Sequence, residues 1–276
     1  MQPTVPAGGP VEVWAAGDAY EPYIGRWSRL VAREFLAWLG TAAGGTWLDV
    51  GCGTGALGAT VLAIAGPAAL VGLDPSAGFV ADARARLDDR RARFVVADAR
   101  RLPLAGGRFD AVVSGLVLNF VPDPAAAVRE MARVARPGGR VGAYVWDYAG
   151  GMELIRRFWD AAAALDPAAA ALDEGRRFPL CQPEPLAGLF RAAGLAEVAV
   201  RPIQVPTRFS DFDDYWTPFL GGQGPAPGYA MSLPAPRRAA LRDELAARLP
   251  GAADGSIALT ARAWAVAGTT AAVSAG

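Results

Sequence analysis

The stretch "WLDVGCGTGALG", residues 47–58, decides how the rest of the chain is interpreted. It begins with a short apolar run and then has glycines at positions 51, 53, 55 and 58. A buried strand, a glycine turn and a helix share this pattern, because glycine allows the left-handed backbone of a tight turn. Residues 53–58 alone match the G-x-G-x-x-G fingerprint of dinucleotide sites. Counted from Asp49, the same stretch is an acidic residue followed by three alternate glycines, so the loop alone leaves its ligand open.

Strand and helix signals alternate around this stretch. Apolar runs predict five strands, at 46–50, 69–74, 93–98, 109–118 and 140–146. Helical spacing of apolar residues predicts four helices, at 23–39, 55–65, 75–87 and 124–135. The predicted strands do not alternate apolar with polar residues, which is typical of a parallel sheet buried on both faces. We therefore expect an α/β fold with a doubly wound sheet.

The second half of the chain has a different rhythm. Residues 151–165 and 184–193 are predicted helices, and residues 197–205 and 256–268 alternate like half-buried strands. These two late strands lack a strand–helix–strand repeat between them, so we expect an antiparallel pair at the far side of a mostly parallel seven-stranded sheet. The expected organisation has four parts: a flexible N-terminal segment at 1–22, one domain at 23–268, a mostly helical lid within it at 148–255, and a tail at 269–276.

Composition excludes several kinds of chemistry. The chain has 276 residues, 27 basic and 27 acidic residues, and no histidine; every basic residue is an arginine. A histidine triad, a histidine metal ligand and a lysine Schiff base are therefore impossible, and two cysteines cannot form a tetrahedral zinc site alone, so no metal is expected. The zero net charge argues against nucleic acid as a partner. No secretory signal and no stretch long enough to enter a membrane stably is found, and we expect a cytoplasmic protein.

Three carboxylates narrow the choice of ligand, because each ends one of three successive predicted strands. Asp49, Asp74 and Asp98 should share the carboxyl edge of the sheet, where open α/β folds bind ligands. Asp74 suits the hydroxyls of a ribose in any adenosine-containing ligand. Asp49 would repel a pyrophosphate but would attract an ammonium and a sulfonium group. Asp98 can accept a hydrogen bond from the exocyclic amine of adenine.

With these residues identified, the chain resembles the class I S-adenosylmethionine-dependent methyltransferases, specifically the small-molecule branch similar to the ubiquinone/menaquinone-biosynthesis type. Five motifs carry the resemblance in that family's order and spacing: "WLDVGCGTG", "LVGLDPS", "FVVADARRLPLAGGRFDAVVSG", "VLNFVPDP" and "REMARVARPGGRVGAYVW". The strong part of the match covers residues 46–147. It implies a Rossmann-like methyltransferase fold, S-adenosylmethionine as the cofactor and a small-molecule acceptor.

The resemblance also implies roles for individual residues. Those that match the methionine-binding loop are Asp49, Gly51, Gly53 and Gly55. Those that match the ribose and adenine site are Asp74, Pro75, Ser76, Asp98 and Ala99. The segment 116–120, which begins at Leu116, matches the part that lies under the cofactor and faces the acceptor. That segment often carries histidine in the family, whereas this chain has Asn119, so base catalysis from this position is in doubt.

Further candidates come from the predicted edges of the site. Near the N-terminus, Tyr20, Tyr23 and Arg26 precede the first helix; Arg26 is a candidate partner for the cofactor carboxylate, and the tyrosines are candidates for acceptor binding. At the end of the fifth strand, Trp146 is a candidate for acceptor binding, and Asp147 and Tyr148 are candidate catalytic groups. The segment 211–229 is rich in aromatic residues and acids and is expected to form the lid over the acceptor, with Tyr215 as a candidate catalytic group and Trp216 in acceptor binding. Asn119 completes the set of candidate catalytic residues.

Three alternatives remain open on the sequence alone. The first is a nicotinamide- or flavin-dependent oxidoreductase, which the glycines at 53–58 together with Asp74 would also fit. The second is a cofactor-binding protein without chemistry of its own. The third is a nucleic-acid methyltransferase, which the missing basic surplus and the sequence Leu118-Asn119-Phe120-Val121, in place of an Asn-Pro-Pro-Tyr type of segment, make the weakest. The sequence does not decide the acceptor, the methylated atom or the oligomeric state.

Overall fold

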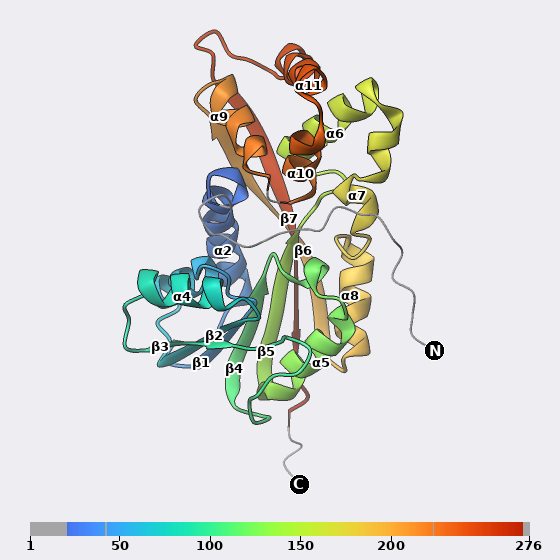
Figure 1. The fold of residues 1–276 in the computed structure, drawn as a ribbon. Helices are drawn as coiled ribbons and strands as arrows, with labels where there is room; N and C mark the ends of the chain where they lie inside the picture. Colours follow the sequence, from blue (N-terminus) through green and yellow to red (C-terminus); the bar gives the residue numbers. More distant parts are fainter. Residues whose placement is uncertain (1–20, 42, 223, 273–276) are drawn as a thin grey trace.

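The computed structural model describes residues 21–41, 43–222 and 224–272 (Figure 1). Of the flexible segment expected at 1–22, only residues 21 and 22 lie inside these ranges. Of the tail expected at 269–276, residues 269–272 are described, and Thr269 is the last residue of a strand. The core is a seven-stranded sheet in the order β3-β2-β1-β4-β5-β7-β6. Its strands are β1 Thr46–Val50, β2 Ala69–Asp74, β3 Ala92–Val96, β4 Phe109–Gly115, β5 Ala135–Trp146, β6 Ala196–Phe209 and β7 Ile257–Thr269. β1 to β5 run parallel and β7 pairs antiparallel with both β5 and β6, which confirms the predicted sheet.

Helices cover both faces of this sheet. The helices and short helical turns are η1 Glu21–Gly25, α2 Arg26–Leu39, α3 Ala56–Ile64, α4 Ala77–Arg86, η2 Leu118–Phe120, α5 Pro124–Val134, α6 Glu153–Leu165, η3 Pro167–Ala171, α7 Glu174–Arg177, α8 Pro183–Ala192, α9 Phe212–Trp216, η4 Thr217–Gly221, α10 Pro225–Ser232 and α11 Ala235–Arg248. In Figure 1, α2 and α4 lie on one side of the sheet, and α5 and α8 lie on the other. This is the doubly wound arrangement that the alternating strands and helices predict.

Two predicted helix starts are explained by side-chain caps. The hydroxyl of Ser76 accepts a hydrogen bond from the amide of Phe79 (3.3 Å) at the start of α4. The carboxylate of Asp123 accepts one from the amide of Ala126 (2.8 Å) at the start of α5, where Pro124 is the first helical residue. Each cap satisfies an amide that has no partner inside its helix. The two helices therefore begin close to the carboxyl edge of the sheet.

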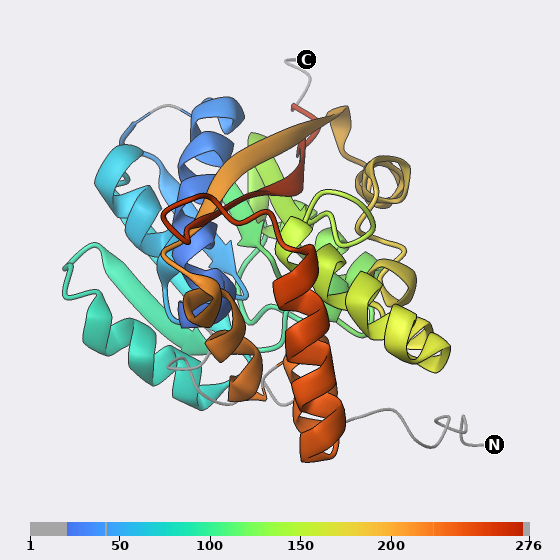
Figure 2. The same ribbon diagram turned by 90° about the horizontal axis from the view of Figure 1, so that it is seen from above.

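The last two strands extend beyond the rest of the sheet. β7 pairs with β5 only from Ala263 to Thr269, whereas it pairs with β6 from Ile257 to Thr269. The outer half of this antiparallel strand pair carries a cap formed by α6, α7, α9, α10 and α11 above the carboxyl edge (Figures 1 and 2). Along the outer half of β6, every second side chain is buried, as in Ile203, Val205 and Phe209. This alternation is the feature that made the late strands recognisable in the sequence.

The cap has its own aromatic core. Phe219 stacks on Phe158 with ring centroids 4.6 Å apart and also contacts Tyr215 and Tyr23. Such packing accounts for much of the aromatic content of the predicted lid. Within the described ranges, no helix is long and apolar enough to cross a membrane.

Candidate functional site

The glycine loop after β1 has the conformation that its sequence predicts. Gly51, Gly53 and Gly55 have φ angles of +75°, +52° and +91°, which favour glycine. A Cβ atom at Gly51 would lie 2.5 Å from Val117, and one at Gly55 would lie 2.7 Å from Leu87, so neither position has room for a side chain. Around Gly53 nothing lies within 4 Å of such an atom. The loop therefore packs tightly at both ends and is open in the middle.

Asp74, the last residue of β2, fastens this loop. Its Oδ2 accepts a hydrogen bond from the Gly53 amide (3.1 Å), and its Oδ1 accepts one from the Ser76 amide (2.9 Å). The side chain is 7% exposed, and burial raises the pKa of its carboxyl, an effect that these two amides oppose. The two bonds hold the carboxylate at the mouth of the loop and leave lone pairs for a further donor.

Asp49 lies behind the loop. Its side chain is fully buried, and within the described residues neither carboxylate oxygen accepts a hydrogen bond of normal geometry. Burial and the nearby charge of Asp74 raise the pKa of Asp49 to about 7, and the amide of Gly58 offsets this only in part. Asp49 is thus enclosed by the protein behind the loop and does not face the open space around Gly53. Near neutral pH its carboxyl changes between a neutral and a negatively charged form.

Asp98 lies two residues beyond β3, because the strand ends at Val96 and not at the predicted residue 98. Its carboxylate accepts hydrogen bonds from the Arg100 side chain at 2.6 to 3.1 Å and from the Arg100 amide at 2.8 Å. These bonds lower the pKa of the Asp98 carboxyl. The side chain is about half exposed, so the carboxylate is charged and accessible.

One cavity of about 430 Å³ joins these elements. Its first part is formed by the glycine loop, the ends of β2 and β3 and the start of α4. We call this part the loop half, and its residues are Gly51, Cys52, Gly53, Thr54, Ala56, Leu57, Leu73, Asp74, Pro75, Phe79, Asp98, Ala99 and Arg100. A second part faces it from η1, α2, η2 and β5. We call this part the aromatic wall, and its residues are Ile24, Ser28, Phe120, Tyr144, Trp146 and Tyr148. Gly115, Leu116, Val117, Val121 and Pro122 complete the lining.

The junction between the two parts is strained. Leu116 has a φ of +62°, which is unusual for a residue with a side chain. Its amide donates to the carbonyl of Tyr144 (2.8 Å), and the preceding Gly115 leaves room for the Tyr144 ring, whose hydroxyl would lie 2.5 Å from a Cβ atom there. The end of β4 is thus held in one shape against β5. Strain of this kind is common at ligand sites.

The structure brings most of the predicted cofactor residues together at the cavity, but only some of the predicted acceptor-binding and catalytic residues. Of the predicted residues, those that line the cavity are Gly51, Gly53, Asp74, Pro75, Asp98, Ala99, Leu116, Trp146 and Tyr148. Gly55 and Ser76 shape the lining from outside it. The lining residues Phe79, in the loop half, and Ser28 and Tyr144, in the aromatic wall, were missed. Of these three, Tyr144 could have been predicted most easily from the sequence, because it lies two residues before Trp146 on the same strand and therefore shares its face.

Arg26 and Asp147 do not line the cavity, and each binds an oppositely charged side chain instead. Arg26 donates to Asp214 in the cap (2.8 Å), and its guanidinium stacks on the rings of Trp27 and Phe209. Asp147 is buried, binds the Arg262 guanidinium at 2.5 Å and accepts from the Gly150 amide. Each side chain is thus already paired with an opposite charge from another part of the fold, and neither residue lines the cavity. Their predicted roles in cofactor binding and catalysis stay predictions, which no contact within the described residues supports.

The remaining candidates also lie off the cavity. Asn119, in η2, does not line it, although its Nδ2 is buried without a partner in the described chain. Trp216 and Tyr23 are 5% and 3% exposed and belong to the aromatic core of the cap. The segment 211–229, apart from the undescribed residue 223, contributes nothing to the lining, and its role as a lid over the acceptor stays a prediction. Tyr20 lies outside the described residues.

Tyr215 is a core residue, and its replacement tests this placement. The ring is fully buried, its hydroxyl donates to the carbonyl of Leu154 (3.0 Å), and burial raises the pKa of the phenol. We expect Tyr215→Phe to lower the free energy of unfolding by about 1 kcal/mol, the usual value of one such bond, and to leave ligand binding in the cavity unchanged. Thermal unfolding and a ligand titration measure the two effects. Unaltered stability combined with lost binding would return Tyr215 to the site.

A buried acid that the sequence did not single out holds the cap together. Glu174, at the start of α7, accepts hydrogen bonds from the indole of Trp159 in α6 and from the Ala226 amide in α10. It is 1% exposed, and burial raises its pKa to about 7. One carboxylate therefore connects three helices of the cap. No local pattern marks such a residue, because its partners come from distant parts of the chain.

Comparison with known proteins agrees with this geometry. Residues 48–142 match the family described as "Methyltransferase domain". A demethylmenaquinone methyltransferase of Roseiflexus sp. (strain RS-1) is 36% identical over 172 residues, which cover 57% of this chain and 70% of that protein. The ubiquinone/menaquinone biosynthesis C-methyltransferase UbiE of Desulfotalea psychrophila is 31% identical over 196 residues, covering 66% and 76%. A solved structure of Haemonchus contortus phosphoethanolamine N-methyltransferase 2 in complex with S-adenosyl-L-methionine is similar in fold, with a TM-score of 0.57 and 17% identity over 92% of this chain and 56% of that one.

Proposed function

The chain belongs to the class I S-adenosylmethionine-dependent methyltransferases and transfers a methyl group from S-adenosylmethionine to a small molecule, and we propose that its cavity binds both substrates. The cofactor binds in the loop half, and the acceptor binds at the aromatic wall. One observation carries the proposal: the charged side chains that line the cavity, Asp74, Asp98 and Arg100, all belong to the loop half, and Arg100 is paired with Asp98. The loop half is thus acidic, and the aromatic wall is uncharged.

The residues present fit the cofactor. Gly53 faces open space, the first turn of α3 lines the cavity through Ala56 and Leu57, and helix N-termini favour a carboxylate. Asp74 is fixed by two amides and has lone pairs for ribose hydroxyls. When bound, S-adenosylmethionine supplies an electrophilic methyl group on a sulfonium sulfur. An acidic surrounding stabilises that positive charge, whereas it would repel the pyrophosphate that an oxidoreductase cofactor carries.

The proposed roles of the loop-half residues follow from these contacts. Gly51, Gly53 and Gly55 shape the loop that holds the methionine part, and Asp49 supplies negative charge from behind it. Asp74 accepts from the ribose, and Ser76 positions Asp74 through its amide. Pro75 and Leu116 form apolar contacts around the adenosine, and Asp98 with Ala99 faces the edge of the adenine.

The role of Asp98 gives a prediction about adenine. Because Arg100 already occupies part of this exposed carboxylate, Asp98→Ala should weaken binding of the adenosyl cofactor by only about 1 kcal/mol. The loss should disappear for the inosine analogue, which has no exocyclic amine to donate. Calorimetric titration with S-adenosylhomocysteine and S-inosylhomocysteine measures both values.

The matched control is Asp89→Ala. Asp89 makes the same set of contacts with Arg91, including a 2.6 Å ion pair, but lies outside the cavity. The Asp89→Ala variant should bind S-adenosylhomocysteine and S-inosylhomocysteine with the wild-type affinities. If wild-type protein binds the two ligands equally well, Asp98 does not recognise the amine.

The aromatic wall favours a flat apolar acceptor. Phe120, Tyr144, Trp146 and Tyr148 supply ring surface, and Phe178 behind them contacts both Phe120 and Tyr148 with centroids 5.2 and 5.5 Å away. Such a surface suits an aromatic ring. The two relatives above act, by their names, in menaquinone and ubiquinone biosynthesis, and one is a C-methyltransferase. We infer that the acceptor is an oxygenated aromatic ring of the quinol type.

Positioning and exclusion of water are the main contributions of this chain to the reaction. The chain has no histidine or lysine, and the aromatic wall has no carboxylate, so the acceptor must ionise largely by itself, as a quinol or phenol can. The wall holds the acceptor in line with the loop half and replaces water around it. Tyr148 is the one of the four candidate catalytic residues that lines the cavity, and its role is to orient the acceptor.

A transfer assay with methyl-labelled cofactor tests this function. The protein is incubated with labelled S-adenosylmethionine and, separately, with a reduced naphthoquinone, a simple phenol and an aliphatic amine, and the products are analysed by mass spectrometry. We expect labelled methyl on the aromatic acceptors, most rapidly on the quinol, and none on the amine. Transfer to the amine alone would contradict the proposed acceptor class.

A further inference from the structure

Trp146 carries an unused hydrogen-bond donor at the aromatic wall. It is the last residue of β5, its side chain is 1% exposed, and it lines the aromatic wall. Within the described chain, its indole Nε1 has no hydrogen-bond partner. A buried N–H without an acceptor is costly, and beside a cavity a bound ligand or water can supply the missing partner.

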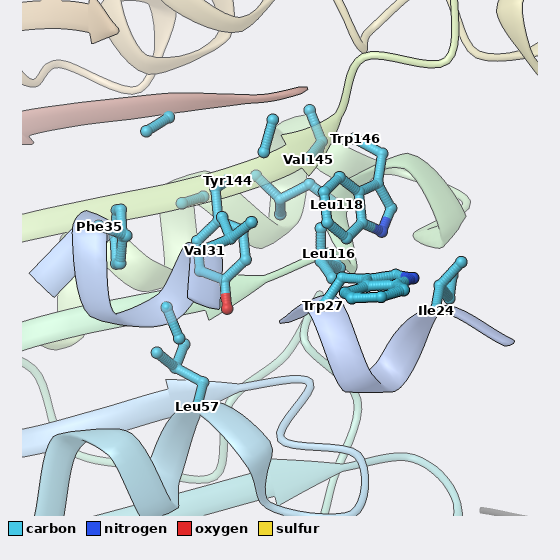
Figure 3. Packing of buried hydrophobic residues seen from close by; sticks show 14 of the residues in the cluster. Ile24, Trp27, Val31, Phe35, Leu57, Leu116, Leu118, Tyr144, Val145 and Trp146 are labelled. Carbon is cyan, nitrogen blue, oxygen red and sulfur yellow. The ribbon is translucent and has the colours of Figure 1, made fainter. Parts of the chain in front are cut away.

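Trp27, in the same buried cluster as Trp146, carries a second unused donor. It lies in the first turn of α2, is 8% exposed, and its Nε1 also lacks a partner among the described residues. Figure 3 shows the nitrogen-bearing edges of Trp27 and Trp146 turned toward Ile24, which lines the cavity. Trp27 itself is not part of the lining and lies directly behind it. Contacts with Arg26 and Phe209 hold its ring in place.

The chemistry of these two atoms restricts their partner. An indole N–H donates and cannot accept, so it binds oxygen but offers nothing to an ammonium or amide N–H. We propose that Trp146, assisted by Trp27, donates a hydrogen bond to an oxygen substituent of the acceptor and thereby selects oxygen-bearing rings over amines and plain hydrocarbons. This inference rests on the proposed function, because it assumes that the acceptor occupies the aromatic wall.

The test measures binding of three ring probes to the complex with S-adenosylhomocysteine: 2-naphthol, naphthalene and 2-naphthylmethylammonium. Wild-type protein should bind 2-naphthol most tightly and the ammonium probe least tightly. Trp146→Phe keeps an aromatic ring and removes the N–H group. It should weaken 2-naphthol binding roughly three- to tenfold, the usual range for one hydrogen bond, and leave naphthalene binding unchanged.

Trp27→Phe should give a smaller loss of the same kind. The matched control is Trp264→Phe, because the indole nitrogen of Trp264 is also buried without a partner in the described residues but lies outside the cavity. This control should leave all three affinities unchanged, and affinity for S-adenosylhomocysteine should be the same in every variant.

The outcomes separate this inference from the proposed function. If Trp146→Phe weakens naphthol and naphthalene equally, or if wild-type protein prefers the ammonium probe, the oxygen contact is wrong while a ring-binding wall remains. If the cofactor product binds but no ring probe does, the aromatic acceptor is contradicted and the inference falls with it. Should Trp146→Phe fail to fold, the order of the three probes on the wild-type protein and the Trp27→Phe variant still decide.

Discussion

Replacing Asp74 by alanine is expected to weaken S-adenosylmethionine binding by about 2 to 4 kcal/mol, roughly 30- to 1,000-fold, the largest effect of any single change in the site. Two losses add. The ribose hydroxyls lose a charged acceptor, and hydrogen bonds to charged groups are stronger than those between neutral groups. The amides of Gly53 and Ser76 also lose the carboxylate that fastens the glycine loop to the end of β2.

Calorimetry of Asp74→Ala, Asp74→Asn and Asp89→Ala separates these losses. The asparagine keeps one oxygen acceptor without the charge, so its loss should be intermediate. Asp89→Ala removes a partly exposed acid that does not line the cavity, and this variant should bind S-adenosylmethionine like the wild type. An Asp74→Ala variant that folds normally and binds within threefold of wild type would remove Asp74 from the cofactor site.

The second large effect concerns Asp49 and pH. Because its pKa in the folded protein is about 7, the carboxyl is neutral at pH 6 and charged at pH 8. The positive sulfonium and ammonium groups of S-adenosylmethionine favour the charged form. Cofactor affinity should therefore rise about tenfold between pH 6 and pH 8. Asp49→Asn should abolish the rise and bind more weakly at pH 8.

The same carboxyl affects folding with the opposite sign. Its pKa rises from 3.8 in the unfolded chain to about 7 in the folded one, so the stabilising contribution is full below pH 4 and disappears as the pH increases through 7. Asp49 should cost the ligand-free protein about 1.4 kcal/mol of stability between pH 6 and pH 8. Burial is the main cause of this raised pKa, the nearby charge of Asp74 raises it further, and the Gly58 amide opposes both.

Glu174 provides the control, because its pKa is also raised to about 7 but it lies in the cap. Glu174→Gln should change the pH dependence of stability and keep that of cofactor affinity, whereas Asp49→Asn should change both. An unchanged pH dependence of affinity in Asp49→Asn would show that Asp49 does not act on the bound cofactor.

The sequence was most informative where local chemistry and topology coincide. Parallel strands have their carboxyl ends at one edge, so acids at the ends of successive strands had to meet; Asp74 and Asp98 line one cavity, and Asp49 lies just behind it. The glycines at 51, 53 and 55 could be interpreted because each needs a backbone that other residues avoid. The alternation in β6 and β7 likewise predicted the antiparallel pair.

Aromatic and paired residues were predicted less well. Tyr215 and Trp216 were predicted to contact a ligand, but the sequence does not distinguish a ring buried in a core from a ring that contacts a ligand. Arg26 and Asp147 found partners, Asp214 and Arg262, that are more than 100 positions away in the chain. Such pairings depend on tertiary packing and have no local signal. This is also why the acceptor wall was only partly predicted.

Separate titrations of the wild-type protein with S-adenosylhomocysteine and with NAD decide which cofactor the glycine loop binds. We expect saturable binding of one S-adenosylhomocysteine per chain, with stabilisation of about 2.7 kcal/mol at a hundredfold excess over the dissociation constant, and no binding of NAD. Saturable binding and stabilisation by NAD, with none by S-adenosylhomocysteine, would contradict this expectation.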